Sequence, residues 1–303
     1  QELLTELLSL RGPADFVWWA LFIIAALKGV TAAVTRKGGG SAGTFMPALV
    51  IGGAVGAGFA ILIDPVLDTV ERDLQVLSDL GLELSATLET HVHADHLSAA
   101  PYIQQRLGGR IAIGAAISTV QQTFGEIFCA GPGFARDGSQ FDVLLSDGDS
   151  IDIGGLSGRA MHTPGHTPAC MTYVLGDAVF VGDTLFMPDG GTARADFPGG
   201  DARMLYQSIQ RILSLPGEYR IFVCHDYLPN GRELEFETTV AAQRHDNIHV
   251  HDGSTEDGFA GMREKRDATL GMPKLILPSL QVNMRAGQMP PAEDDGNVYF
   301  KVP

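Results

Sequence analysis

The sequence repeats a pattern that strongly constrains the fold: a short apolar segment with strand character ends directly in His or Asp. Ala86–Glu89 leads into T-H-V-H-A-D-H at residues 90–96. The other examples are Leu156–Ala160 before M-H-T-P-G-H-T-P, Ala178–Val181 before G-D, and Ile221–Val223 before C-H-D. Polar residues that directly follow a strand lie on loops at a sheet edge, where binding sites commonly form. The pattern predicts one site assembled from several strand ends.

Between these segments the chain alternates between strand-like and helix-like periodicity. Ala60–Asp64 is expected to be a strand, Leu67–Leu80 has the spacing of an amphipathic helix, and another helix is expected to begin near Leu97. Asp201 precedes the helical pattern of Ala202–Leu213 and is a suitable N-cap. Such alternation is typical of a layered α/β domain.

Composition excludes several classes of protein. The chain has 303 residues, of which 45% are hydrophobic, so a packed core rather than general disorder is expected. Its net charge of -15 argues against a nucleic-acid partner, because phosphate binding needs a basic surface. Three cysteines do not make a disulfide scaffold and are consistent with a reducing compartment, so we expect a cytoplasmic location.

The first 60 residues differ from the rest of the chain. Residues 1–60 carry four basic and three acidic side chains, whereas residues 61–303 carry 17 basic and 33 acidic ones. The uncharged run Phe45–Ile63 is marginal in length for crossing a bilayer, and the run Phe16–Leu27 is short unless Thr31–Val34 extend it past Lys28. We therefore place a domain boundary at residue 60. An alternative for Leu49–Asp64 is a strand, a glycine turn and a second strand that opens the following domain.

The stretch around residues 37–47, K-G-G-G-S-A-G-T-F-M-P, resembles a segment of the CLC chloride channels. Gly43, Phe45 and Pro47 match the G-x-F-x-P pattern that opens a membrane helix in that family. The resemblance implies an anion-binding helix start, which agrees with the attraction of helix N-termini for anions. Because it covers only residues 1–60, we interpret this apolar segment as a fused or mis-joined fragment and a possible membrane hairpin.

The histidines of the strand ends are candidate metal ligands. Imidazoles crowded beside carboxylates are typical ligands of Zn or Fe. These candidates are His91, His93, Asp95, His96, His166, Asp183 and His225. The remaining histidines are interpreted otherwise: His162 as structural, and His245, His249 and His251 as surface residues. Cys170 and Cys224 are expected to be core thiols.

The motifs T-H-V-H-A-D-H, H-T-P-G-H-T, G-D-T-L-F and C-H-D-Y, in this order, resemble the metallo-β-lactamase superfamily over residues 60–303. The resemblance implies an αββα sandwich with the metal at one sheet edge. In its two-metal members, one ion would be held by His91, His93 and His166. The second would be held by Asp95, His96 and His225, with Asp183 bridging. This set suits a binuclear zinc thioester hydrolase of the glyoxalase II type, which uses a metal-bound hydroxide.

Other motifs resemble the persulfide dioxygenases of the same superfamily. The matching segments are Phe186–Arg194, R-A-D-F at 194–197, H-D-Y at 225–227 and N-M-R-A-G at 283–287. Ala195 and Ala286 depart from the usual pattern. The resemblance implies a single Fe(II) held by His91, His166 and Asp183, which leaves coordination positions open. His93, Asp95, His96, His225 and Asp226 are then assigned to the surrounding catalytic machinery, and Arg194 and Tyr227 to substrate binding. For Arg194, a salt bridge to Asp196 or Asp201 is an alternative.

Three functional hypotheses follow. The first is an Fe(II) persulfide dioxygenase that oxidises glutathione persulfide or a related small persulfide with O2, giving sulfite and glutathione. The second is the binuclear zinc hydrolase. The third is a membrane-anchored or anion-binding fusion in which residues 61–303 are an inactive passenger. For the enzyme we expect a homo-oligomer, with membrane association confined to residues 1–60.

Overall fold

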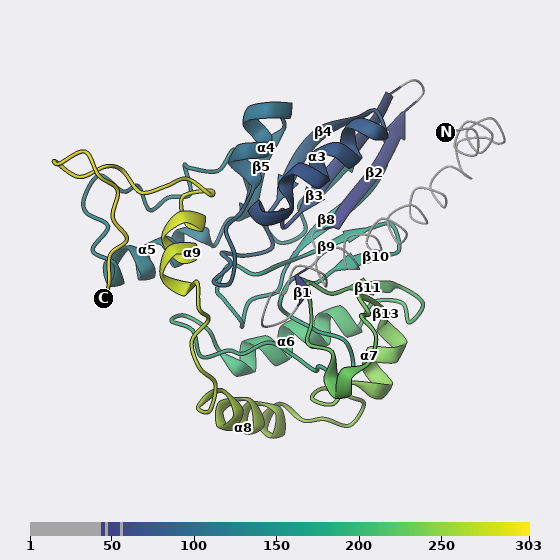
Figure 1. Cartoon of the computed structure of the whole chain (residues 1–303). Helices are drawn as coiled ribbons and strands as arrows, with labels where there is room; N and C mark the ends of the chain where they lie inside the picture. Colours follow the sequence, from purple (N-terminus) through teal and green to yellow (C-terminus); the bar gives the residue numbers. More distant parts are fainter. Residues whose placement is uncertain (1–43, 46–47, 55–56) are drawn as a thin grey trace.

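Several strands carry buried apolar side chains on both faces, which requires a covering layer on each side of the sheet. In β3 (Ala57–Ile63), Ile61 and Ile63 belong to one core cluster, whereas Ala60 and Leu62 belong to another. The computed structural model, which describes residues 44–45, 48–54 and 57–303, places two sheets face to face with helices outside them (Figure 1). The predicted α/β class and αββα sandwich are confirmed.

The first sheet has the strand order β2-β3-β4-β5-β6. Its other members are β2 (Ala48–Ala54), β4 (Leu82–Leu88), β5 (Arg110–Gly114) and β6 (Val143–Leu145). Because β3 and β4 are parallel, their carboxyl ends meet at one edge, and Asp64 donates its backbone N–H to the carbonyl of Leu88 at 2.9 Å. This edge carries the T-H-V-H-A-D-H loop.

The second sheet has the strand order β13-β11-β10-β9-β8-β7. Its members are β7 (Ser150–Ile153), β8 (Leu156–His162), β9 (Met171–Leu175), β10 (Ala178–Phe180), β11 (Arg220–Phe222) and β13 (Glu237–Thr239). β10 and β11 are parallel, and β8 runs in the same direction because β9 is antiparallel to both β8 and β10. The carboxyl ends of these three strands therefore meet at one edge, which brings their His- and Asp-containing loops together.

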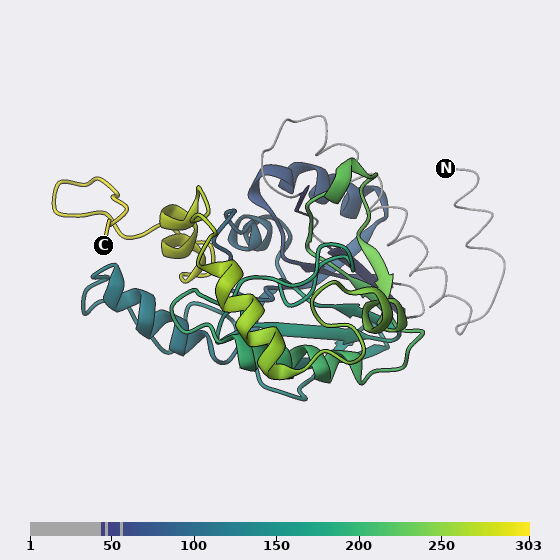
Figure 2. The same cartoon turned by 90° about the horizontal axis from the view of Figure 1, so that it is seen from below.

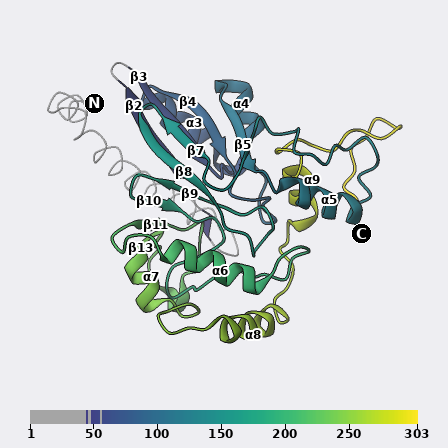
Figure 3. The ribbon, with the colours of Figure 1, turned by 180° about the vertical axis from the view of Figure 1, so that it is seen from behind.

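Helices cover the outer faces of both sheets (Figure 3). α3 (Val70–Asp79) and α4 (Ala100–Leu107) pack on the first sheet, and α6 (Ala202–Leu213), α7 (Val240–Asp246) and α8 (Glu256–Asp267) pack on the second. α5 (Ile117–Ile127) and α9 (Ile276–Asn283) share a third cluster at the side of the sandwich. Short 3-10 turns occupy Leu67–Thr69 and Pro229–Gly231.

The expected local elements agree closely with these bounds. Asp201 caps α6 by accepting a hydrogen bond from the backbone N–H of Met204 at 2.8 Å, as predicted. The helix expected near Leu97 begins at Ala100 instead, because Ser98 forms an isolated bridge with Val66.

The hairpin alternative for Leu49–Asp64 is confirmed. β2 and β3 pair antiparallel over their whole length, and β3 pairs with β4 on its other side. A membrane helix across residues 48–63 is therefore wrong, because the apolar side chains of Val50, Ile61 and Ile63 fill the core between the sheets. β1 (Thr44–Phe45) pairs with β12 (His225–Asp226).

The structure tests the expected membrane segment only in part. Residues 1–43, which hold the first apolar run and Gly43, lie outside the described residues, as does Pro47. Within the described part of the chain, none of the helices combines the length and the apolar character needed to cross a bilayer. The boundary at residue 60 stays a prediction.

Candidate metal centre

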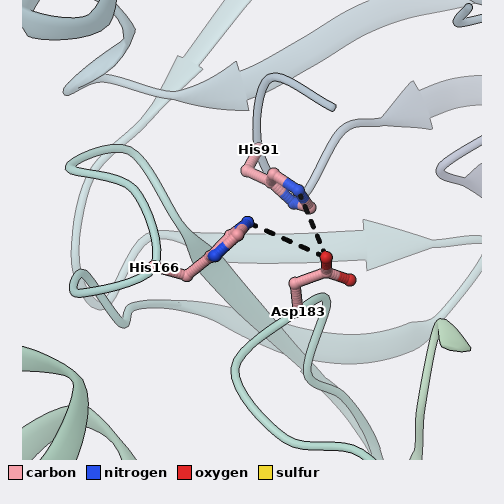
Figure 4. A group of neighbouring side chains, drawn as sticks. All are labelled: His91, His166 and Asp183. Carbon is pink, nitrogen blue, oxygen red and sulfur yellow. Dashed lines mark ion pairs between the residues drawn. The ribbon is translucent and has the colours of Figure 1, made fainter. Parts of the chain in front are cut away.

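Two imidazoles and one carboxylate from three different loops face one another at the shared sheet edge (Figure 4). The ligand atoms of His91, His166 and Asp183 all lie within 4.8 Å of one another. The Nε2 atoms of His91 and His166 lie 3.9 and 3.8 Å from the same oxygen, Oδ2 of Asp183. The sequence assigned these three residues to a single metal, and the fold brings them together.

Hydrogen bonds fix the protonation of both imidazoles. The Nδ1 atom of His166 lies 2.7 Å from the carbonyl oxygen of Arg194, which can only accept, so Nδ1 carries the proton. Thr90 donates its hydroxyl hydrogen to Asp64 at 2.8 Å and therefore accepts from Nδ1 of His91 at 3.0 Å. In both rings Nδ1 is thus engaged by the protein, and Nε2 faces the carboxylate of Asp183. Burial, followed by the charges of neighbouring histidines, also holds the pKa of His91 well below its ordinary value.

Close packing requires glycine beside two of these ligands. Gly165 has a φ of +139°, and a Cβ there would lie 2.3 Å from the backbone of Leu205 in α6. Gly182 has a φ of +53°, and a Cβ there would lie 2.7 Å from Oγ1 of Thr90. The P-G-H and G-D turns therefore need glycine, both for backbone conformation and for space. They place His166 and Asp183 directly at the site.

The remaining candidate ligands form a second group beside the first. His225 Nε2 lies 3.4 Å from Oδ1 of Asp183 and 3.5 Å from Oδ2 of Asp95, whereas His96 Nδ1 lies 3.4 Å from Oδ1 of Asp95. Burial opposes ionisation of Asp95, but the charges of His225 and His96 outweigh it and hold the pKa of Asp95 well below its ordinary value. Asp183 thus contacts both groups.

His93 faces two buried carboxylates. Its Nε2 atom lies 2.9 Å from Oδ1 of Asp64 and 3.5 Å from Oε2 of Glu89. Burial opposes protonation of His93, but the charge and hydrogen bond of Asp64 outweigh it and raise the pKa of His93 well above its ordinary value. A carboxylate on one imidazole nitrogen orients the ring and strengthens the other nitrogen as a ligand.

Asp64 is a site residue that the sequence reasoning missed. Its side chain is buried and accepts hydrogen bonds from the backbone N–H of Thr90 at 2.7 Å and from the Thr90 hydroxyl. It also lies within hydrogen-bond distance of His93. The signal was present, because the apolar strand Ala60–Ile63 ends directly in Asp, as the strand before Asp183 ends in Gly-Asp.

Asn283, at the end of α9, binds the backbone of the histidine loop, residues 90–98. Its side-chain amide donates to the carbonyls of His93 at 2.9 Å and His96 at 2.8 Å, and its oxygen accepts from the backbone N–H of Ser98 at 3.0 Å. The sequence indicated the 283–287 segment by resemblance alone. No local pattern predicts contacts across more than 180 residues.

The metal candidates open into a cavity of about 520 Å³ that is rich in cations. Among its lining residues are four cations: Arg194, Arg263, Arg266 and Lys274. The lining carboxylates among the described residues are Asp95 and Asp183, both at the metal candidates. Cations thus outnumber carboxylates in the lining, with Arg194 paired with Asp196 and Arg263 with Asp267. A cavity of this size suits a small anionic ligand.

Both predicted substrate-binding residues line this cavity. Arg194 also forms the salt bridge to Asp196 that was the alternative, with its Nε 2.6 Å from Oδ1, and donates to the carbonyl of Gly271 at 2.7 Å. Tyr227 is half exposed and packs against the rings of Phe186 and His225. Burial raises the pKa of Tyr227, so its phenol stays protonated at neutral pH.

Asp226 points away from the metal candidates into a neighbouring loop. Its carboxylate accepts from Arg232 at 2.7 and 2.9 Å and from the backbone N–H groups of Leu228 and Glu235. These contacts close the loop that follows Tyr227. They give Asp226 an organising role, while its assignment to the catalytic machinery stays a prediction.

The other histidines mostly match their interpretation. His162 contacts the carbonyl of Pro168 at 2.8 Å, as expected of a structural residue, and His245 and His251 are exposed. His249 corrects the prediction, because it is partly buried beneath the 190–192 turn and its Nδ1 accepts from the backbone N–H of Thr192 at 3.0 Å. Burial lowers the pKa of His249 to about 4. Its polar sequence neighbours gave no sign of this.

The two expected core thiols, Cys170 and Cys224, are buried. Burial raises the pKa of Cys170 to about 12, which leaves its thiol protonated and unreactive.

Comparison with known proteins agrees with this architecture. The sequence profile of the metallo-beta-lactamase superfamily matches residues 48–225, more than half of the chain. The chain belongs to the metallo-β-lactamase superfamily. A profile of the voltage gated chloride channel family also matches residues 1–91, of which the described strands β2, β3 and β4 belong to the sandwich.

Similar proteins carry names from both enzyme classes. The chain is 56% identical over 269 residues to a probable metallo-hydrolase of Burkholderia pseudomallei, which covers 82% of this chain and 92% of that protein. It is 35% identical over 237 residues to the mitochondrial persulfide dioxygenase ETHE1 of Bos taurus, covering 77% and 82% respectively. The crystal structure of ETHE1 from Myxococcus xanthus matches with a TM-score of 0.66 and 31% identity, covering 80% and 95%. The protein is therefore a metal-dependent enzyme of this superfamily.

Proposed function

We propose that the protein is a mononuclear Fe(II) persulfide dioxygenase that converts glutathione persulfide, O2 and water to glutathione and sulfite. The observation that carries the proposal is the set formed by His91, His166 and Asp183 at the inner end of the cationic cavity. Two imidazoles and one carboxylate form the set that holds Fe(II) in non-haem oxygenases. The similarity to persulfide dioxygenases over most of the chain supports the same function.

The orientation of the two imidazoles fits a bound divalent cation. Each ring uses Nδ1 for a hydrogen bond to the protein and turns Nε2 toward the same carboxylate oxygen of Asp183. All three donors line the cavity, and a set of three protein ligands leaves further coordination positions of Fe(II) for other ligands. Fe(II) bound there would supply the redox chemistry that joins the persulfide sulfur to O2.

The cavity lining fits a persulfide that carries carboxylates. The Arg194 guanidinium, held in place by Asp196, presents a fixed positive charge at the wall. Arg266 and Lys274 also line the cavity and carry positive charge. These cations suit the two carboxylates of a glutathione backbone, and the protonated Tyr227 can donate a hydrogen bond. Substrate binding by Arg194 and Tyr227 is part of this proposal.

In this proposal the residues beside the three ligands orient them. His225 contacts Oδ1 of Asp183, the oxygen other than the one that faces His91 and His166. Asp95 contacts His225, and His96 contacts Asp95. His93 connects the histidine loop to Asp64 at the end of β3. Loss of any one of them is expected to weaken metal binding without abolishing it, because such supporting contacts typically change metal affinity by about 10–100-fold.

A binuclear zinc thioester hydrolase is the second candidate. It is favoured by the second group, because Asp95, His96 and His225 lie beside Asp183, which could bridge two ions. The name of the Burkholderia pseudomallei relative also supports this candidate. In this case His96 would be a direct ligand of the second ion.

The deciding experiment measures O2 consumption by Fe(II)-loaded protein after addition of glutathione persulfide. The proposal predicts consumption with one sulfite formed per O2, and loss of both in an Asp183→Ala variant that no longer binds metal. A hydroxyacylglutathione thioester serves as the control substrate and should remain intact. Thioester cleavage without O2 consumption, together with loss of half of the bound metal in His96→Ala, would establish the hydrolase instead.

The proposal also includes the expected location, oligomeric state and partners of the enzyme. The enzyme would act in the cytoplasm as a homo-oligomer, with no nucleic-acid partner. The third hypothesis, an anion-binding or membrane-anchored fusion, rests on residues 1–60, which lie within the profile match to chloride channels over residues 1–91. Comparing detergent-free solubility of the full chain and of a chain lacking residues 1–43 tests that hypothesis directly.

A further inference from the structure

A buried ion pair on α8 lies at the wall of the metal cavity, which Arg263 helps to line. Arg263 and Asp267 are one helical turn apart and are 1% and 4% exposed. Nε and Nη2 of Arg263 lie 2.9 and 2.6 Å from Oδ1 of Asp267. Burial of two charges is costly, and further hydrogen bonds have to satisfy their remaining polar atoms. Here those partners lie on the loop that carries Arg194.

The pair holds the backbone of this loop at two points. Asp267 Oδ2 accepts from the backbone N–H of Ala195 at 2.9 Å, and Arg263 Nη1 donates to the carbonyl of Thr192 at 3.2 Å. Thr192 and Ala195 flank Arg194, whose carbonyl accepts the Nδ1 proton of His166 at 2.7 Å. A continuous chain of hydrogen bonds therefore runs from α8 to a metal candidate. Figure 2 shows α8 in yellow-green, crossing the underside of the molecule.

We propose that Arg263 and Asp267 are positioning residues, which orient His166 for metal binding through the Arg194 carbonyl. The proposal rests on the metal site of the proposed function but not on the reaction performed there. With the carbonyl fixed, His166 keeps its proton on Nδ1 and directs Nε2 toward Asp183. When the backbone at residues 192–195 is released, the carbonyl can move and the imidazole loses its fixed tautomer and direction.

The loop has a separate attachment, so loss of the pair need not unfold it. His249 accepts the backbone N–H of Thr192 at 3.0 Å, and Gly191 packs so closely on the His249 ring that a Cβ there would lie 2.2 Å from Nδ1. Arg194 is also tied to Asp196 and to the carbonyl of Gly271. The pair therefore refines the position of one carbonyl within a loop that stays attached elsewhere.

The test is a titration of the full-length, metal-free protein with Co(II), whose visible absorption reports ligand geometry. Asp267→Asn keeps the side-chain size but removes the charge that holds Arg263. It is expected to weaken Co(II) binding by about 10–100-fold and to change the spectrum, as supporting residues of metal ligands do. Arg263→Lys keeps the charge beside Asp267 and leaves the contact with Ala195. Its Co(II) affinity is expected to lie between those of Asp267→Asn and the wild type.

A matched control separates positioning from general loss of stability. Phe259 on α8 is buried against Tyr206 and takes no part in the hydrogen-bond chain, so Phe259→Leu is expected to lower the melting temperature while leaving that chain in place. This variant is expected to bind Co(II) as tightly as the wild type. Equal Co(II) affinity and spectrum in Asp267→Asn and the wild type would overturn the proposal. So would equal weakening in Phe259→Leu and Asp267→Asn.

The outcomes also separate this proposal from the proposed function. Failure of the wild-type protein to bind Co(II) would refute the metal site itself. Tight wild-type binding that Asp267→Asn leaves unchanged would refute the positioning role alone. Weakened binding in Asp267→Asn supports the positioning role whether the loaded enzyme is an oxygenase or a hydrolase.

Discussion

Replacing Asp226 by alanine should destabilise the fold through a defined set of contacts. The Asp226 side chain is 1% exposed and accepts four hydrogen bonds. Two come from the guanidinium of Arg232, at 2.7 and 2.9 Å, and two come from the backbone N–H groups of Leu228 and Glu235, at 3.2 and 2.9 Å. Alanine removes all four and leaves a gap beneath the loop.

The loss of stability depends on which hydrogen bonds the donors can still make without Asp226. All four bonds go to a carboxylate and are charge-assisted, at about 1.5–3 kcal/mol each, so the gross loss is about 6–12 kcal/mol. Arg232 keeps its bonds to Asp189 at 2.6 and 2.7 Å, and its side chain is 22% exposed, so water can replace part of the loss. We therefore expect about 3 kcal/mol, the lower end for breaking a buried pair. At about 2–4 °C per kcal/mol, the melting temperature should fall by about 6–12 °C.

The assay compares urea and thermal unfolding of the metal-free protein with those of two controls. Asp226→Asn keeps one acceptor and should lose about half as much stability. Asp189→Ala removes the exposed partner of Arg232 and should cost less than about 1 kcal/mol, as surface pairs do. A melting temperature of Asp226→Ala within about 2 °C of the wild type would refute the reasoning. Asp189→Ala as damaging as Asp226→Ala would also refute it.

Three further predictions concern other parts of the molecule. The pKa of His249 falls from 6.5 to about 4 on folding, so the unfolded chain is protonated at a higher pH than the folded one. The free energy of unfolding should therefore fall as the pH is lowered from 6.5 to 4. Urea unfolding should show a shallower fall in His249→Gln. Deleting residues 1–58 removes β2 and the buried Val50 and should lower the melting temperature. Deleting residues 1–43 leaves the β2–β3 hairpin and should not lower it. Equal melting temperatures of the two forms would contradict a structural role for β2. Iodoacetamide should label the exposed Cys129 in the folded protein, and Cys170 and Cys224 should react only after urea is added. Mass spectrometry can follow the labelling. Labelling of Cys170 in the folded protein would contradict its burial and its pKa of about 12.

Local sequence was enough to predict much of the site. Each metal candidate follows an apolar strand directly, and the direction of a strand decides at which sheet edge its last residues lie. Glycine in P-G-H and G-D marks turns that side chains would obstruct. Asp201 before an amphipathic segment predicts the start of α6, because an N-cap acts within a single turn. These signals span a few residues, so they can be read without the fold.

Resemblance to a family predicted more of the fold and of the site than the local sequence pattern did. It indicated the αββα sandwich and ordered the ligands into one-metal and two-metal sets. The sequence left the β2–β3 hairpin as one of two alternatives, because the glycine-rich run from Phe45 to Ile63 is compatible both with a membrane helix and with two strands. The pairing of β3 with β4 decides between them, and that pairing depends on residues about 25 positions away.

Only the tertiary structure decided which polar residues support the site. Asp64 contacts His93 across 29 residues of sequence, and Asn283 contacts the backbone of His93 across 190 residues. Asp267 binds the backbone N–H of Ala195 across 72 residues. Likewise, nothing near His249 in the sequence indicates that it is partly buried beneath Thr192. A buried polar group must find a hydrogen-bond partner wherever the packed chain supplies one. Local periodicity carries no information about that partner, so these contacts emerge only when the sheets and helices are assembled.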